Sequence, residues 1–193
     1  MLLISCSSQD KKDEKTASIK QNVETPGAVA KAPESIEEFY NGPVDLSSAK
    51  PGDVIYSQAL TGLDSKINGW RVLYVTTSLE GNLTATSALV YAPRDKKAHK
   101  LMVWAHGTIG IADECAPSRS KDGTEKIFFF NDYISKGYAV IAPDYEGLGT
   151  PGTHPFLVGT SEGRSILDSI RMGQTFEPIN PDPGAVVIGH SQG

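Results

Sequence analysis

Residues 185–193 read Ala-Val-Val-Ile-Gly-His-Ser-Gln-Gly, four apolar strand formers followed by a serine with a glycine two positions away on each side. The pattern G-x-S-x-G directly after a buried strand is typical of a sharp strand-to-helix turn that exposes the serine hydroxyl. Glycine is required at both ends of this turn because side chains there would collide with neighbouring elements. We therefore predict that Ser191 is a nucleophile and that Gly189, His190 and Gly193 form the turn around it.

Upstream of this turn, short apolar runs alternate with segments of helical spacing. We expect strands at residues 71–77, 83–91, 100–105, 138–142 and 185–188, with the first two joined as a hairpin by the turn at 80–82. We expect helices at residues 36–40, 125–136 and 161–172, with Ser161 as N-cap of the last and with Gly137 and Gly173 as C-terminal stops. This order predicts the α/β class, with a mostly parallel sheet covered by helices on both faces.

A hairpin ahead of alternating strands and helices, followed by a nucleophile turn, predicts the α/β-hydrolase fold specifically. In that fold the triad acid and base follow the nucleophile along the chain. Since Gly193 is the last residue, we expect residues 51–193 to be the N-terminal half of such a domain, truncated after the fifth strand.

The first fifty residues predict an anchored protein. Leu3-Ile4-Ser5-Cys6 resembles a bacterial lipobox, so residues 1–6 are interpreted as the remnant of a lipoprotein signal peptide in which Cys6 is lipidated. A complete signal peptide has an apolar core of ~7–15 residues, whereas five residues precede this cysteine. The alternative is a chance cysteine near the N-terminus. Residues 7–50 are rich in polar residues and predict a disordered tether and the approach to the domain.

The composition of the chain indicates which classes of partner it can bind and where the protein is located. The net charge is −5, which argues against a nucleic-acid partner because such proteins usually carry a basic face. No stretch of 18 apolar residues is present, so membrane contact is expected only through the possible lipid anchor. We predict a secreted protein or a membrane-anchored lipoprotein of a bacterial cell envelope. No metal or organic cofactor is implied.

A second motif, His106-Gly107-Thr108, follows the strand expected at 100–105. Nucleophile-turn hydrolases place one oxyanion donor at this position and the other on the residue after the nucleophile. We therefore predict that the backbone N–H groups of Thr108 and Gln192 form the oxyanion hole, with Gly107 supporting the loop. The alternative is a tight turn with a structural His106. His190 is interpreted as packing beside the turn, because adjacent side chains diverge there.

Three further polar residues lie near the expected site. Asp144 and Glu146 follow the strand at 138–142, and His154 lies in the same loop region. The triad acid comes from a later strand in this fold, so we interpret these groups as loop-structuring. Cys115 is interpreted as structural, because Ser191 already supplies a nucleophile.

Several motifs together resemble the secretory lipase family, the lipase A type of yeasts and bacteria, over about residues 50–193. They are His106-Gly107-Thr108, Cys115-Ala116-Pro117-Ser118, residues 143–149 (Pro-Asp-Tyr-Glu-Gly-Leu-Gly), His154-Pro155, residues 161–164 (Ser-Glu-Gly-Arg) and residues 189–193. The resemblance implies a carboxylesterase or triacylglycerol lipase that acts on ester or lipid substrates through an acyl-enzyme. It also implies that the triad aspartate, the triad histidine and a lid lie beyond Gly193, and that Cys115 pairs with a second cysteine.

Two other functions remain open at this point. One is a peptidase or another deacylase on the same fold, because a fold alone does not choose the substrate. The other is a non-catalytic surface lipoprotein in which this half-domain serves as a binding module, without the triad residues needed for hydrolysis.

Overall fold

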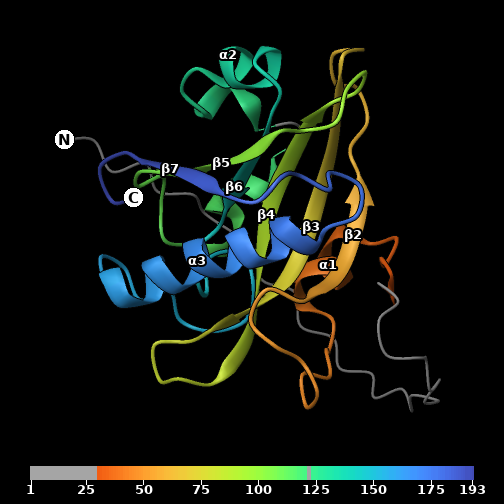
Figure 1. Cartoon of the computed structure of the whole chain (residues 1–193). Coiled ribbons are helices and arrows are strands. Elements are labelled where there is room, and N and C mark those ends of the chain that lie inside the picture. Colours follow the sequence, from red (N-terminus) through yellow and green to blue (C-terminus); the bar gives the residue numbers. More distant parts are fainter. Residues whose placement is uncertain (1–29, 121–122) are drawn as a thin grey trace.

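A computed structural model describes residues 30–120 and 123–193 of the chain. The described residues form a seven-stranded sheet in the order β1-β2-β3-β4-β6-β5-β7 (Figure 1). The strands are β1 (Ala30–Lys31), β2 (Val54–Ala59), β3 (Ile67–Thr77), β4 (Leu83–Pro93), β5 (Lys100–Ala105), β6 (Tyr138–Pro143) and β7 (Ala185–Gly189). The helices are α1 (Ile36–Asn41), α2 (Phe130–Ser135) and α3 (Gly159–Thr175), with short 3₁₀ turns at Asp113–Cys115, Pro117–Arg119 and Thr124–Lys126.

The sheet is mixed. Strands β2, β3, β4 and β6 pair antiparallel in succession, whereas β6, β5 and β7 pair parallel, as do β1 and β2. The carboxyl ends of parallel strands meet at one edge of a sheet, where α/β proteins bind their ligands. The segments that follow β5, β6 and β7 therefore converge, and the candidate site lies among them.

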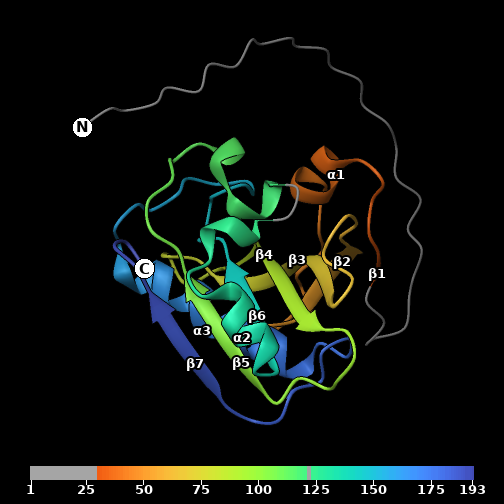
Figure 2. The same ribbon diagram turned by 90° about the horizontal axis from the view of Figure 1, so that it is seen from above.

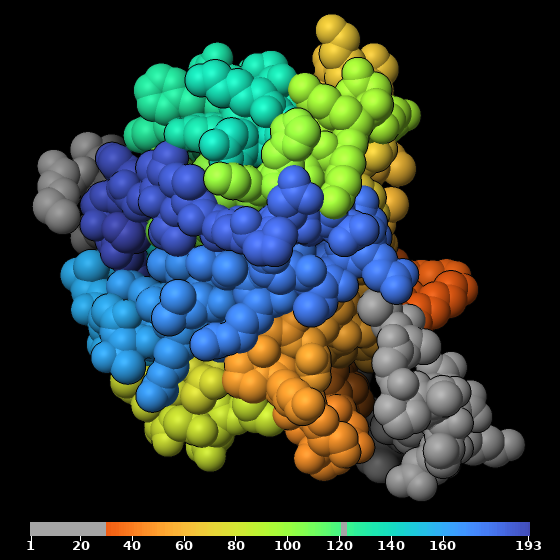
Figure 3. Space-filling view, in the orientation of Figure 1, coloured from red at the N-terminus to blue at the C-terminus, as the bar shows by residue number. Residues whose placement is uncertain are grey.

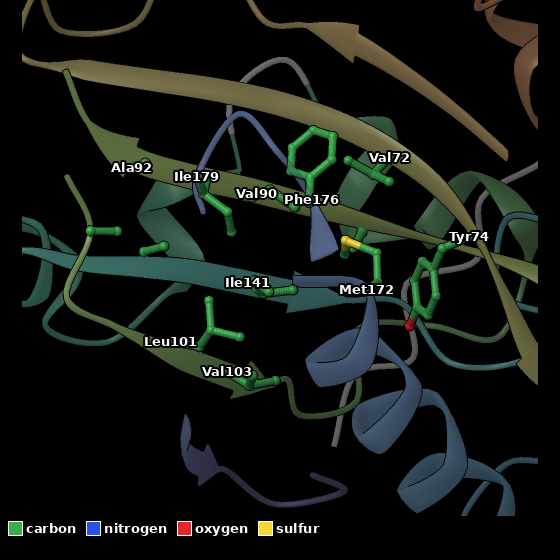
Figure 4. Close-up of a cluster of buried hydrophobic side chains, with 13 residues drawn as sticks. Val72, Tyr74, Val90, Ala92, Leu101, Val103, Ile141, Met172, Phe176 and Ile179 are labelled. Atoms are coloured by element: carbon green, nitrogen blue, oxygen red, sulfur yellow. The ribbon is translucent and has the colours of Figure 1, made fainter. Parts of the chain in front are cut away.

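Helices α2 and α3 cover opposite faces of the sheet (Figures 1 and 2). Neighbouring residues of a strand point to opposite faces. Val90 of β4 accordingly packs in the cluster that includes Met172 of α3 (Figure 4), and Leu89 packs in the cluster that includes Phe130 of α2. Both clusters are buried, so the central strands are apolar on both sides, as short apolar runs predict. Within the described residues, no helix is both long and apolar enough to cross a membrane.

The fold starts earlier in the chain than predicted. Phe39 and Tyr40 of α1 are buried and pack against Leu73 of β3, and β1 pairs with β2. The described fold therefore includes residues 30–50, which the sequence assigned to the tether and the approach to the domain. Strand β2 was not predicted because its residues show no clear alternation of apolar and polar side chains. With β1 and β2 included, the strand before Ser191 is the seventh and not the fifth. Residues 7–29 lie outside the described part.

Strand β7 lies at the edge of the described sheet. It pairs only with β5 and is the outermost strand of the described sheet, so Val186 and Val187 are 43% and 47% exposed. Figure 3 shows the segments of α3 and β7 next to each other on the face turned toward the viewer. The apolar residues of β7 predicted the strand correctly. The exposure of its two valines follows from the position of β7 at the edge of the sheet.

Two helix boundaries also differ. The helix expected at 125–136 begins only at Phe130, because Phe129 has a left-handed φ of 59° that interrupts the helix. The helix expected at 161–172 runs from Gly159 to Thr175, and its N-cap is Val158. Gly173 does not end it. A Cβ on Gly173 would collide with the Ile141 side chain, so this glycine allows α3 to lie close to β6.

Candidate active site

The turn after β7 has the geometry of an exposed serine on a tight bend. Ser191 has a φ of 56°, in the left-handed region that non-glycine residues rarely adopt. The Gly193 amide donates to the His190 carbonyl at 3.0 Å, which closes the turn around the serine. A Cβ on Gly189 would lie 2.5 Å from the Gly193 carbonyl oxygen, and a Cβ on Gly193 would collide with the backbone of Ala105. Both glycines are therefore required by space.

The loop after β5 lies directly against this turn. The His190 amide donates to the Ala105 carbonyl at 3.1 Å. A Cβ on Gly107 would lie 2.8 Å from His190 Nδ1 and 3.3 Å from Ser191 Cβ. Glycine at this position therefore allows the loop after β5 to lie against the nucleophile turn. The Thr108 hydroxyl donates to Gln192 Oε1 at 3.1 Å.

The structure therefore brings together Ser191, Gly107, Thr108 and Gln192, the residues that the sequence grouped as nucleophile and oxyanion hole. Across the part of the chain that is described, the backbone N–H groups of Thr108 and Gln192 donate to no other residue. Neither group is therefore committed to an acceptor within the described residues.

His106 is held within the protein. Its side chain is 5% exposed, its ring stacks on Tyr145 at 4.4 Å, and its Nδ1 lies 2.8 Å from the Gly107 carbonyl oxygen. Burial lowers the pKa of His106 to about 4, so the ring is neutral at pH 7. Tyr145 donates its hydroxyl to the His106 carbonyl at 2.7 Å, which ties the loop after β6 to the loop after β5. His106 shapes the site and carries no charge into it.

His190 packs beside the turn. Its ring is stacked over Trp104 with centroids 6.5 Å apart and meets Phe128 edge-on at 5.2 Å. Among the described residues, no histidine ring is hydrogen-bonded to the Ser191 hydroxyl. The described histidines therefore include no group placed as the base of a serine triad.

A pocket of about 290 Å³ opens beside the serine. Ser191 and His190 lie on its wall, and most of the remaining lining is apolar, including Trp104, Ile127 and Phe128. A pocket of this character favours an apolar group of a ligand over a charged one, because a charge would lose its hydration there.

The side chain of Gln192 joins a polar cluster at the start of α3. Gln192 Nε2 donates to Glu162 Oε1 at 2.7 Å and lies 3.3 Å from His154 Nε2. In the sequence, Glu162 stood out only as a member of the motif at residues 161–164, so its contact with the nucleophile turn was missed. No local sequence pattern predicts the contact between Glu162 and Gln192, because the two residues are 30 positions apart in the chain.

Asp144 and Glu146 hold loops, the role predicted for them. Asp144 is fully buried, and its carboxylate accepts hydrogen bonds from the hydroxyls of Ser87 and Ser118. Glu146 accepts from the Leu79 amide at 2.9 Å. Neither carboxylate contacts Ser191. Across residues 30–120 and 123–193, no three His, Cys, Asp or Glu side chains group as metal ligands would.

Replacing Asp144 with asparagine should change how stability depends on pH. Burial raises the pKa of Asp144 from 3.8 to about 6. The folded state therefore binds this proton more tightly than the unfolded state, and the resulting stabilisation is lost as pH rises through about 6. Asp144→Asn does not titrate, so its free energy of unfolding relative to wild type should rise by about 3 kcal/mol between about pH 3 and pH 7.

Urea unfolding of both proteins across this pH range measures the difference. Asp182→Asn is the control, since Lys97 lowers the pKa of this exposed carboxyl and the relative stability of the variant should change with the opposite sign. A pH-independent difference for Asp144→Asn would contradict the prediction.

Cys115 is partly exposed and forms no disulfide within the described residues. A Cβ on Gly110 would collide with the Cys115 Sγ, so this thiol packs against the loop after β5. No described cysteine pairs with it, and Cys6 lies outside the described residues. The disulfide implied by the family resemblance therefore stays a prediction.

The chain is similar in sequence to proteins named as secreted lipases. A family model described as secretory lipase matches residues 121–193. Secreted triacylglycerol lipase LIP7 of Malassezia globosa is 29% identical over 170 residues, covering 80% of this chain and 36% of that protein. Lipase 6 of Candida albicans is 27% identical over 180 residues, covering 83% and 38%. The chain therefore spans little more than a third of the length of these curated relatives.

Solved structures of a lipase and an esterase also match this chain. The crystal structure of Candida antarctica lipase A has a TM-score of 0.66 at 27% identity, covering 81% of this chain and 39% of that chain. The rice cell wall degrading esterase LipA from Xanthomonas oryzae has a TM-score of 0.61 at 21% identity, covering 75% and 43%, which supports the fold alone. The predicted α/β-hydrolase fold and the predicted resemblance to the secretory lipase family are both confirmed.

Proposed function

From this similarity to the secretory lipase family, we propose that the protein is a serine-dependent carboxylic ester hydrolase that acts on triacylglycerols or related esters. The observation that carries the proposal is the place of Ser191, on a left-handed turn after β7 and against the Gly107–Thr108 loop. Relatives named as triacylglycerol lipases support the substrate class. The apolar pocket beside the serine is suited to the hydrocarbon part of an ester.

The proposed reaction proceeds through an acyl-enzyme. Ser191 Oγ attacks the ester carbonyl carbon and gives its proton to a histidine, which an aspartate orients; this fold places both after the nucleophile in the chain. The carbonyl oxygen becomes an oxyanion, which accepts from the backbone N–H groups of Thr108 and Gln192. The C–O bond then breaks, the alcohol leaves with the proton from the histidine, and water releases the acid by the same path.

Reaction with an alkyl fluorophosphonate tests the nucleophile. The reagent phosphonylates only activated serines, so we expect one adduct, located on Ser191 by peptide mass spectrometry. The assay uses the protein at its natural length. Absence of an adduct on Ser191 would contradict the proposed nucleophile.

A substrate panel then separates lipase or esterase from peptidase or deacylase. We expect p-nitrophenyl esters to be cleaved and aminoacyl anilides to be inert, because an apolar pocket favours an apolar acyl group. Rapid anilide cleavage with inert esters would reverse the assignment. No labelling and no turnover of either class would favour the non-catalytic binding module.

Secretion is part of the proposal, since several relatives are named as secreted lipases. Lipidation of Cys6 and a place in a bacterial envelope stay predictions from the sequence, because Cys6 lies outside the described residues.

A further inference from the structure

We propose that Glu162 is a positioning residue that sets the oxyanion hole through the side chain of Gln192. The inference rests on the proposed function, because it assigns a role to a residue one step removed from the reacting atoms. It is carried by a chain of hydrogen bonds that runs from α3 through the nucleophile turn to the loop after β5.

The first link is a buried carboxylate. Glu162 lies in the first turn of α3 and is 6% exposed. Its Oε1 accepts from the Leu157 amide at 3.1 Å and from Gln192 Nε2 at 2.7 Å. Buried charges need such partners, and a charged acceptor makes a stronger hydrogen bond than a neutral one. Figures 1 and 2 show the C-terminal end of the chain beside the beginning of α3.

The second link fixes which way the Gln192 amide points. His154 Nδ1 lies 2.9 Å from the Glu146 carbonyl oxygen, which only accepts, so Nδ1 carries the proton. In the neutral imidazole His154 Nε2 is then the acceptor, and Gln192 Nε2 lies 3.3 Å from it. Both amide N–H groups of Gln192 are thus used. A reversed amide would place its oxygen against a carboxylate and a lone pair.

The third link reaches the other oxyanion donor. With its nitrogen held by Glu162, Gln192 turns Oε1 toward Thr108, whose hydroxyl donates to it at 3.1 Å. The two residues proposed to supply oxyanion N–H groups are therefore joined by a side-chain hydrogen bond across 84 residues of sequence. Donors that are fixed before the reaction stabilise the oxyanion most, because no reorganisation is needed during the step.

The experiment compares Glu162→Ala with Glu162→Gln in the protein at its natural length. Glu162→Ala removes the acceptor, so we expect kcat for a p-nitrophenyl ester to fall about tenfold with KM within about twofold. Affinity for an alkyl boronic acid, which forms a tetrahedral adduct on serine, should fall in parallel. Glu162→Gln keeps an oxygen that accepts from Gln192 and should retain most of the activity.

Asp168→Ala is the matched control. Asp168 lies on the same helix, is 2% exposed, and accepts from the Thr76 hydroxyl at 2.8 Å, with no contact to Gln192 or Thr108. We expect this variant to lose stability while its kcat per fluorophosphonate-labelled serine stays that of wild type. Rates are divided by labelled serine in every variant, so a loss of folded protein does not mimic a loss of positioning.

If Glu162→Ala does not fold, the same measurements are made on Gln192→Met instead. It keeps the backbone N–H and removes the amide, and it should lower kcat by about the same tenfold. Wild-type kcat and boronate affinity in Gln192→Met or Glu162→Ala would overturn the positioning role. Equal losses in Asp168→Ala would also overturn it, because they would indicate a general effect of α3. An inert wild type that the fluorophosphonate does not label would instead overturn the proposed function itself.

Discussion

Ser191→Ala should abolish ester hydrolysis, lowering kcat by at least about 10⁴-fold, because removal of a serine nucleophile leaves only binding and oxyanion stabilisation. The fold should be unaffected. Alanine keeps the Cβ, so the φ of 56° costs the same, and the exposed Ser191 hydroxyl has no hydrogen-bond partner among the described residues. We expect the free energy of unfolding to change by less than about 0.5 kcal/mol.

The measurement pairs steady-state turnover with urea unfolding. Ser48→Ala, which makes the same chemical change at an exposed position outside the site, is the control and should keep full activity. Hydrolysis by Ser191→Ala at more than about a hundredth of the wild-type rate would assign the nucleophile to another residue.

Gly107→Ala should have the second largest effect, a fall in kcat of about 10²-fold or more. Its Cβ would lie 2.8 Å from His190 Nδ1 and 3.1 Å from the His190 carbonyl oxygen. The His190 side chain is exposed and can turn aside, but its carbonyl oxygen belongs to the backbone of the nucleophile turn and cannot move independently of it. The loop must instead move away from Ser191, and loss of one oxyanion donor costs about 10²- to 10³-fold in kcat.

Gly163→Ala provides the matched control. A Cβ there would meet nothing within 4 Å, and Gly163 lies inside α3, where alanine stabilises a helix by about 0.5–1 kcal/mol relative to glycine. We expect unchanged kcat and a slightly higher unfolding midpoint. Activity measurements with active-site titration distinguish the two glycines. Full activity in Gly107→Ala would mean that this loop does not supply an oxyanion donor.

Much of the architecture could be predicted from the sequence because it depends on local patterns. The run at β5 was placed without error, and the strands β4, β6 and β7 were correct to within two residues, since apolar runs bounded by turn residues carry a strong signal. The two predicted glycine positions beside Ser191 follow from the same kind of local steric rule. The site residues around the turn were therefore identifiable as a group before their distances were known.

Other features depended on contacts between distant segments. Strand β2 has no clear alternation, and it is defined by pairing with β3. Helix α1 belongs to the domain because Phe39 and Tyr40 pack against β3, which no property of the polar N-terminal segment reveals. The interruption of the helix before Phe130 likewise follows from the backbone of Phe129 and not from the spacing of its apolar residues.

The sequence by itself determined the order of strands and helices from β3 onward, the serine turn and the glycines that it needs, because each follows from neighbouring residues and their sterics. The tertiary structure alone decided that Glu162 contacts Gln192 and that Gln192 contacts Thr108. Hydrogen bonds depend on distance and direction in space, and these partners lie 30 and 84 residues apart in the chain. A carboxylate in the first turn of a helix looks like any helix-start charge until the fold places the nucleophile turn beside it.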